Sequence, residues 1–415
     1  MKENSLIELP GRQEAAPTPI SVLDQLVREG ARKMLQAALE VEVAEYVERN
    51  LKYTDKNGHR LVIRNGYLPE REIGTGAGPV QIKQPRVRDE RKGERFTSKI
   101  LPPFMRRAPS VDALIPVLYL KGVSTSDFSE ALTAILGANA AGLSPTNIVR
   151  LKEGWKSEYE EWTKRDLSQK KYVYWWADGI YFKVRLDKDR PCILVIMGAL
   201  EDGTKELIAI KDGHRESKDS WMTLMQEIKR QGLSDGPKLA IGDGALGFWT
   251  ALEEAFPGTR EQRCWVHKTA NVLDKMPKRV QSDAKSLIHE MYLSPTRKDA
   301  LEAYAEFVNR YKAKHPKAVE CLEKDHDVLF AFYDFPAEHW THLRTTNPIE
   351  STFATVRHRT RQTKGCGSRL ATLTMVFKLA KEAERKWRRL NGHHLIAKVV
   401  EGVQFVDGEL KEIAA

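Results

Sequence analysis

The chain has 415 residues, of which 41% are hydrophobic and 30% are charged, and an excess of lysine and arginine gives it a net charge of +10. This composition is typical of two or three folded domains, and no run approaches the roughly 18 consecutive apolar residues of a membrane span. Four scattered cysteines without a Cys-x-x-Cys pair argue against a disulfide framework or a four-thiolate zinc site. The positive charge favours a polyanionic partner, and the opening stretch, without a secretory layout, predicts a cytoplasmic protein.

A long helix and a basic module are the first predicted elements. Residues 21–49 place apolar side chains at helical spacing, which predicts an amphipathic helix in an N-terminal region, residues 1–50, for DNA binding or dimerisation. Residues 51–108 are rich in Gly, Pro and basic side chains, which predicts a small β-containing or irregular DNA-binding module. The basic segments 83–107 and 357–369 could also be ordinary solvated surface.

A helix-turn-helix is predicted within residues 109–168. Three helical runs are separated by glycine-bearing turns, and the third begins at Ser144 with Pro145 at its first helical position. This third run would be the recognition helix, although a plain helical bundle is the alternative. The side chains that it would present to a DNA groove are Thr146, Asn147 and Arg150.

Residues 169–267 change to a pattern of strands. Three extended runs are followed by a helix, a strand, a second helix and a last strand that continues through the segment REQRCWV. This order, βββαβαβ, predicts a mixed α/β core and argues against a doubly wound dinucleotide fold. Residues 268–341 predict an all-α insertion, residues 342–395 two further helices, and residues 396–415 a tail.

The segment LAIGDGALG has the spacing Gly-x-Gly-x-x-Gly at Gly242, Gly244 and Gly247. In a dinucleotide-binding turn the backbone approaches two phosphates, which the carboxylate of Asp243 would repel. The acidic residue expected about 20 positions on is replaced by Glu261 at the start of the next strand. We therefore favour Asp243 as the functional group of this segment.

Two more carboxylates complete a candidate metal site. Asp178 interrupts an apolar strand before Gly179, and a buried Asp is costly unless it is paired or bound to a metal. Glu350 lies in the first turn of a predicted helix, and Arg357 and Arg361 continue its face, placed for phosphate. Asp-Gly turns and an ordinary surface stripe are the alternatives. Carboxylates suit Mg²⁺ or Mn²⁺, and two such ions can promote in-line phosphodiester displacement without a protein nucleophile.

Six stretches carry a resemblance to a known family: RNGYLPERE, LKGVSTSDFSEAL, ADGIYFKV, KDSWMTLMQEIKRQGL, IGDGALGFWTALEEAFPGTREQRCWVHK and HWTHLRTTNPIESTFATVRHRT. Over nearly its full length the chain resembles the Mutator-type insertion-sequence transposases of bacteria. The resemblance implies an RNase H-like core in which Asp178, Asp243 and Glu350 bind two Mg²⁺ or Mn²⁺ ions. It also implies a helical insertion before the helix of Glu350.

The resemblance places the family's Cys-x-x-His element on Cys264 and His267. These two side chains alone make half a zinc site at most, so we expect them to pack or to contact DNA beside the active site. Trp340 either stacks on an unpaired base near the cleaved end or belongs to the core. The segment RDERKGERFTSKILPPFMRR departs from the family's more regular link.

The expected function is that of a DNA transposase. It would bind the terminal inverted repeats of its own element, cleave DNA ends by metal-assisted hydrolysis and join the 3′-hydroxyls to target DNA. Because two ends must be held together, we expect a homodimer or a larger assembly on DNA and no membrane association. The alternatives are an RNase H-like nuclease or resolvase without strand transfer, and a domesticated DNA-binding regulator.

Overall fold

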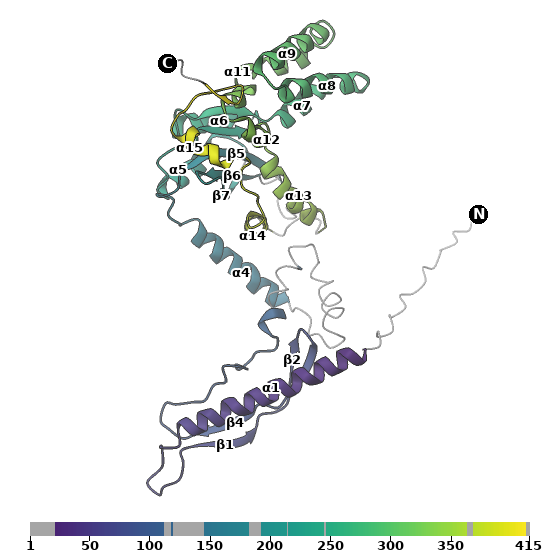
Figure 1. Cartoon of the computed structure of the whole chain (residues 1–415). Coiled ribbons are helices and arrows are strands. Elements are labelled where there is room, and N and C mark those ends of the chain that lie inside the picture. Colours follow the sequence, from purple (N-terminus) through teal and green to yellow (C-terminus); the bar gives the residue numbers. More distant parts are fainter. Residues whose placement is uncertain are drawn as a thin grey trace, which may run out of the picture. The chain divides into compact units, whose positions relative to one another are not determined.

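The computed structural model describes residues 21–111, 118, 145–181, 192–213, 215–244, 246–362 and 368–411. The chain divides into two compact units, Met1–Ile148 and Val149–Ala415, and each is described by itself (Figure 1). The finer division into seven regions stays a prediction. Among the described residues, no helix has the length and apolar character needed to span a membrane.

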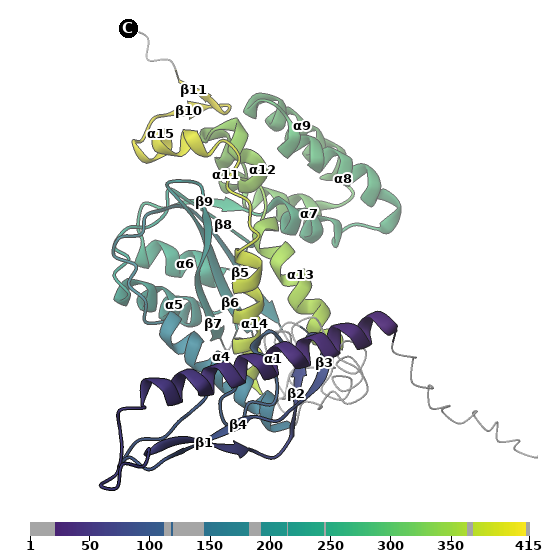
Figure 2. The same cartoon turned by 60° about the horizontal axis from the view of Figure 1, so that its bottom comes forward.

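The first unit is built on one long helix, α1 (Val22–Arg49), which confirms the predicted amphipathic helix. Its N-cap Ser21 accepts a hydrogen bond from the backbone amide of Asp24, which satisfies one of the free amides at the helix start. The helix contacts two small antiparallel ladders (Figure 2). These ladders pair β1 (Val62–Tyr67) with β4 (Pro85–Asp89), and β2 (Arg71–Thr75) with β3 (Gly78–Ile82).

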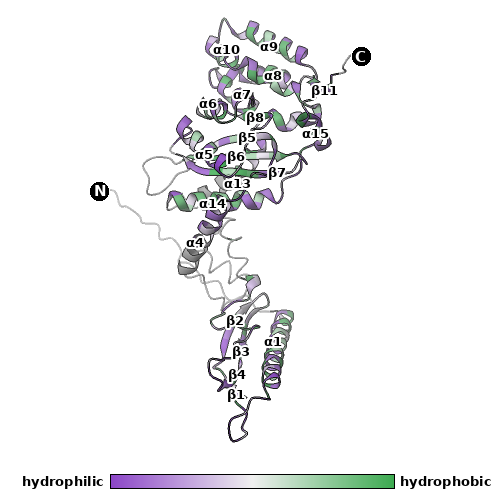
Figure 3. Cartoon of the chain, turned by 90° about the vertical axis from the view of Figure 1, so that its left-hand side faces the viewer, coloured by the Kyte–Doolittle hydropathy of each residue, from purple (hydrophilic) through white to green (hydrophobic). Residues whose placement is uncertain are grey.

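A small apolar core joins α1 to these ladders. Its fully buried members come from the helix, from β2 and β3, and from the segment after β4: Leu39, Ile73, Val80, Ile82 and Leu101. Figure 3 shows the apolar and polar stripes of α1 that this packing requires. The predicted basic module is therefore a β-containing layer against a helix.

The predicted helix-turn-helix is described only at its third helix. This helix, α4 (Pro145–Trp162), begins at the proline predicted for its first position. The two preceding runs and the side chains of Thr146, Asn147 and Arg150 lie outside the described residues. The helix-turn-helix therefore stays a prediction.

The second unit is organised around a mixed sheet of five strands in the order β7-β6-β5-β8-β9. An antiparallel meander is formed by β5 (Tyr172–Tyr181), β6 (Cys192–Leu200) and β7 (Lys205–Gly213). Next to β5, two parallel strands follow, β8 (Leu239–Gly242) and β9 (Arg260–Arg263). The sheet confirms the predicted order βββαβαβ and the mixed α/β class, whereas the RNase H-like assignment stays a prediction.

The two faces of the sheet carry different elements. Trp175 and Ala177 of β5 point into the main core with residues of α5 (Lys218–Arg230) and α6 (Leu246–Ala255). Because side chains alternate along a strand, Trp176 and Asp178 point to the opposite face. There the indole of Trp176 donates a 2.8 Å hydrogen bond to the carbonyl of His342. This face receives the chain segment that leads to Glu350.

The segment between β9 and Glu350 is helical, as the sequence predicts. Its elements are α7 (Trp265–Leu273), α8 (Lys278–Leu293), α9 (Arg297–Tyr311), α10 (Pro316–Glu323), α11 (His326–Leu329), the short 3-10 helices η1 (Ala331–Asp334) and η2 (Ala337–His339), and α12 (Trp340–Leu343). One boundary was wrong: β9 ends at Arg263 because its partner β8 ends at Gly242, so Cys264 caps α7 instead of continuing the strand.

The last part of the unit holds the two predicted helices and a more structured tail than expected. The helices are α13 (Asn347–Gln362) and α14 (Arg369–Glu384). The tail contains α15 (Ile396–Val400), β10 (Phe405–Val406) and β11 (Glu409–Leu410), and the short η3 (His393–Leu395) lies directly before it. The hairpin of β10 and β11 packs on η1. Strands of only two residues give no recognisable pattern in the sequence, so this hairpin could not be predicted.

Candidate active site

Asp178 and Asp243 lie at equivalent positions of neighbouring parallel strands. Trp176 of β5 pairs with Ile241 of β8, and each aspartate follows two residues later. Each carboxylate accepts a hydrogen bond from the next backbone amide, with Asp178 inside β5 and Asp243 directly after β8. The two acids that sequence reasoning singled out are thus brought together by strand register.

The charges of the other two predicted acids, Asp243 and Glu350, affect the pKa of Asp178. Burial is the main cause that raises the pKa of its carboxyl to about 6, the charges of Glu350 and Asp243 contribute in the same direction, and His267 opposes them. Asp178 therefore lies within electrostatic range of both carboxylates. This concentration of negative charge in a half-buried place favours a bound cation.

Glu216 is a fourth carboxylate at the same place, and sequence reasoning missed it. Burial raises the pKa of Glu216 to about 7, and the charges of Asp178 and Asp243 contribute in the same direction. It fits there because Gly179 has no side chain: a Cβ at that position would lie 2.4 Å from the Glu216 Cδ. In the sequence it stands in the charged run RESKD, which is typical of a surface turn.

Glu350 reaches the site from the first turn of α13, where Thr346 holds it. The hydroxyl of Thr346 donates a 3.0 Å hydrogen bond to Glu350 Oε1. The same hydroxyl and the Thr346 amide both lie 3.3 Å from Cys264 Sγ. Because Thr346 and Cys264 are buried, these contacts tie the start of α13 to the start of α7.

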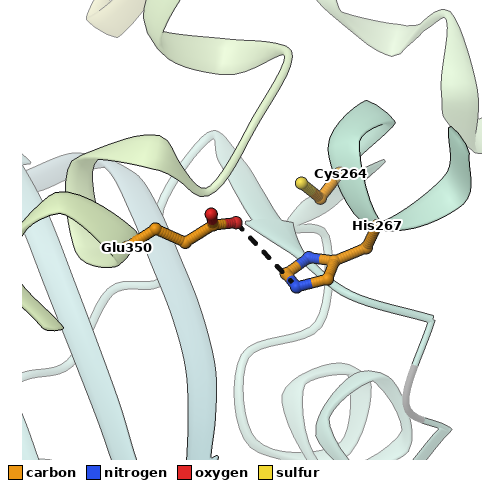
Figure 4. A group of neighbouring side chains, drawn as sticks. All are labelled: Cys264, His267 and Glu350. Atoms are coloured by element: carbon orange, nitrogen blue, oxygen red, sulfur yellow. Dashed lines mark ion pairs between the residues drawn. The ribbon is translucent and has the colours of Figure 1, made fainter. Parts of the chain in front are cut away.

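Cys264, His267 and Glu350 present ligand atoms within 4.8 Å of one another (Figure 4). His267 Nε2 is 3.8 Å from Glu350 Oε1. The hydrogen bond to Cys264, followed by the charges of Asp243 and Asp178, raises the pKa of His267 to about 9. An imidazolium at this position balances part of the negative charge. From sequence, Cys264 and His267 were expected to pack or to contact DNA; the structure adds Glu350 as a third donor beside them, because α13 carries Glu350 across to α7.

Trp340 is a core residue. Its side chain is 6% exposed, its indole donates to the Phe335 carbonyl, and Tyr333 packs edge-on against it with ring centroids 4.8 Å apart. This packing favours the core role over base stacking. Arg357 and Arg361 belong to α13, but their side chains lie outside the described residues.

Two of the three glycines around Asp243, Gly242 and Gly247, serve local packing. A Cβ at Gly247 would lie 2.4 Å from the Glu216 carbonyl oxygen, so α6 begins in tight contact with the segment before α5. Gly244, in contrast, has open space, with its nearest neighbour 3.9 Å away. The spacing that suggested a dinucleotide turn therefore has a structural cause, and Asp243 is the polar group at the strand end.

Comparison with known proteins identifies the family. The family model described as "Transposase, Mutator family" matches residues 4–390. The chain belongs to the Mutator family of transposases. This Mutator-family chain is 52% identical over 299 residues to the transposase for insertion sequence element IS6120 of Mycolicibacterium smegmatis, which covers 72% of this chain and 92% of the relative.

A second relative of the Mutator-family chain is the transposase for insertion sequence element IST2 of Acidithiobacillus ferrooxidans. It is 48% identical over 279 residues, or 67% of this chain and 94% of the relative. Both names support a transposase role. Among solved structures, a chain of the simian T-cell lymphotropic virus intasome in complex with PP2A regulatory subunit B56 gamma matches 49% of this chain and 62% of its own length. Its 13% identity and TM-score of 0.18 carry no argument about fold.

Proposed function

We propose that this transposase binds the terminal inverted repeats of its element, cleaves DNA at their ends by metal-dependent hydrolysis, and joins the 3′-hydroxyls to target DNA. The observation that carries the proposal is the meeting of three acids from distant segments. Asp178 lies within β5, Asp243 directly follows the adjacent parallel strand β8, and both Asp243 and Glu350 raise the pKa of Asp178. Such a cluster is costly in a folded core unless it serves to hold a cation.

The donor set fits Mg²⁺ or Mn²⁺. Asp178, Asp243 and Glu350 would supply hard carboxylate oxygens, and the repulsion that raises the pKa of Asp178 is what a divalent cation would relieve. Two such ions, when bound, activate an attacking hydroxyl and stabilise the leaving oxygen of a phosphodiester. The proposal does not need a protein nucleophile or a nucleoside triphosphate.

The side chains of the protein would position this chemistry. Thr346 orients the Glu350 carboxylate, and His267 supplies a compensating positive charge 3.8 Å from it. Arg357 and Arg361, further along α13, would bind a phosphate of the DNA end. The α4 side chains named above would read the terminal repeat, and at least two copies would assemble to hold two ends.

The test combines the purified chain with Mg²⁺, labelled element-end duplexes and a target plasmid. We expect joined products from the wild type, and no cleavage or joining from Asp243→Asn, with duplex binding retained. Asp283→Asn is the matched control, because Asp283 is exposed on α8, outside the site. Cleavage without joining would favour a nuclease, and binding without either would favour a regulator. Retained joining by Asp243→Asn would remove this residue from the mechanism.

A further inference from the structure

The first unit contains a large, predominantly basic groove. It has a volume of about 1160 Å³ and is lined by residues 68–107 of β2 to β4 and the segment that follows. The arginines along it are Arg71, Arg86, Arg88, Arg95, Arg106 and Arg107. Only three acidic residues line it: Glu72, Asp89 and Glu94. The groove therefore has the charge to bind a polyanion.

The backbone that carries the exposed arginines of the groove is held by strand pairing or by hydrogen bonds. Arg86 and Arg88 are two residues apart on β4, so their side chains point to the same face. Arg106 is fixed through its carbonyl, which accepts a 2.9 Å hydrogen bond from the amide of Gly74. Within the described part of the chain, neither Arg86 nor Arg106 forms an ion pair, whereas Arg88 pairs with Glu90. Arg86 and Arg106 are thus available to an anionic ligand.

Phe104 lies on the rim of this groove and is unusual in two respects. Its side chain is 94% exposed, and its φ of 66° lies in the left-handed region that favours glycine. An exposed phenyl ring gains nothing from folding, and a left-handed backbone at a bulky residue costs free energy. Both costs fall on one residue, which suggests that the ring serves a bound partner.

The turn that carries Phe104 is anchored on its N-terminal side. Leu101 is buried in the core of the unit. The guanidinium of Arg71 donates 3.2 Å hydrogen bonds to the carbonyls of both Leu101 and Pro102. The Met105 amide closes the turn with a 3.3 Å bond to the carbonyl of Pro102. These hydrogen bonds and the burial of Leu101 fix the backbone of the turn, so the exposed position of the Phe104 ring is set by the fold.

We propose that this groove binds the phosphate backbone of duplex DNA and that Phe104 is a wedge that enters the minor groove and unstacks one base step. The inference rests on the proposed function, because it takes the partner to be DNA. A guanidinium group can bind two oxygens of one phosphate at the same time. Minor-groove proteins kink a duplex by inserting an apolar side chain between two base pairs. An acidic protein would match the charge but would leave the exposed ring without a base step to enter.

The wedge is tested with the full chain and an element-end duplex that carries 2-aminopurine at successive positions, because this base brightens when it unstacks. We expect a several-fold rise in fluorescence at one step on binding of the wild type. Phe104→Ala should abolish this rise and weaken binding by roughly tenfold, the effect of losing one stacked contact. Phe104→Leu keeps an apolar wedge and should retain part of the rise.

The arginines are tested through the salt dependence of binding. The double variant Arg86→Ala, Arg106→Ala should lower the slope of log affinity against log salt by about two, because each phosphate contact contributes about 0.9. The double variant Arg230→Ala, Arg279→Ala removes the same charge from exposed positions of the second unit and should leave the slope unchanged. Phe104→Ala should also leave it unchanged, since the ring contacts no phosphate.

The outcomes separate this inference from the proposed function. Suppose that the wild type joins DNA ends and that Phe104→Ala unstacks the base step and binds the duplex as well as the wild type does. The wedge proposal is then overturned, and the proposed function stands. If unstacking depends on Phe104 but no joining occurs, the catalytic proposal fails and the wedge stands. Competition by a poly-glutamate peptide as strong as that by the duplex would also overturn the proposal. Because Phe104 is exposed, Phe104→Ala and Phe104→Leu should unfold at the wild-type temperature. A lower unfolding temperature would mark a folding defect. In that case Phe104→Gly, which removes the ring and also relieves the left-handed backbone, provides the decisive measurement.

Discussion

Thr346 and Glu350 are joined by a 3.0 Å hydrogen bond from the threonine hydroxyl to the glutamate Oε1, one helical turn apart at the start of α13. Replacement of Thr346 by valine keeps the shape of the side chain but removes the donor. We expect the rate of end cleavage to fall roughly tenfold, the effect of about 1.4 kcal/mol of lost orientation. The measurement is single-turnover cleavage of a labelled end duplex.

The matched control for this variant is Thr374→Val in α14. Thr374 is also buried, and its hydroxyl donates to the carbonyl of Leu370 in its own helix instead of to a carboxylate of the site. It should leave the cleavage rate at the wild-type value. A cleavage rate of Thr346→Val equal to that of the wild type would show that Glu350 is oriented without this bond.

Gly247 and Gly244 should respond differently to alanine. At Gly247 a Cβ would lie 2.4 Å from the Glu216 carbonyl oxygen and 2.7 Å from the Lys218 amide nitrogen, both of which are backbone atoms. We expect Gly247→Ala to lower the free energy of unfolding by about 2 kcal/mol or more. Gly244→Ala meets nothing closer than 3.9 Å and should change it by less than about 0.5 kcal/mol. Equal stability of the two variants in urea would contradict the packing described for α6.

His342 should reduce the stability of the second unit in mild acid, whereas the raised pKa values of Asp178, Glu216 and His267 act in the opposite direction. Burial, followed by the charge of Lys205, lowers the pKa of His342 to about 4, below its ordinary value near 6.5. Its contribution to stability is fully present above pH 6.5 and is lost as the pH falls toward 4, since the unfolded chain takes up the proton first. At pH 5 the loss should be about 2 kcal/mol.

Urea unfolding of the wild type and of His342→Gln at pH 7.5 and pH 5 isolates this loss, because the other titrating groups are common to both proteins. All nine tryptophans lie in the second unit, so their fluorescence reports on that unit alone. Burial lowers the pKa of Lys205 to about 8, so this lysine is largely charged in both states across the window and adds little to the slope. His342→Gln should lose about 2 kcal/mol less than the wild type between the two pH values. An equally steep pH dependence in that variant would assign the effect to other groups.

Removal of divalent cations should affect both activity and stability. We expect a chelator to abolish end cleavage and Mg²⁺ or Mn²⁺ to restore it, because the carboxylates offer hard oxygen donors. Ion binding to the folded state should also raise the unfolding temperature. Glu350→Gln should lose this Mg²⁺-dependent rise, whereas Cys264→Ser should keep it. A rise that appears with Zn²⁺ alone and requires Cys264 would instead assign the site to Cys264, His267 and Glu350.

Local sequence patterns predicted the elements of this protein well. The long helix α1, the order βββαβαβ and the helical segment before Glu350 all depend on the spacing of apolar residues along the chain, which a single sequence displays. The same patterns marked Asp178 and Asp243, because an acid that interrupts or ends an apolar strand stands out. The end of β9 could not be predicted in this way, since it is set by the length of its partner β8.

Sequence alone thus determined the main elements of the α/β core, the acids that interrupt or end its strands and, through the six matching stretches, the family. Tertiary structure alone decided which side chains meet. Strand register aligns Asp178 with Asp243, the glycine at position 179 admits Glu216, and Thr346 joins Cys264 to Glu350. The exposure of Phe104 also follows from tertiary structure. The physical reason is that spacing along the chain reflects local backbone preferences, whereas these contacts join segments tens of residues apart through packing that no local pattern records.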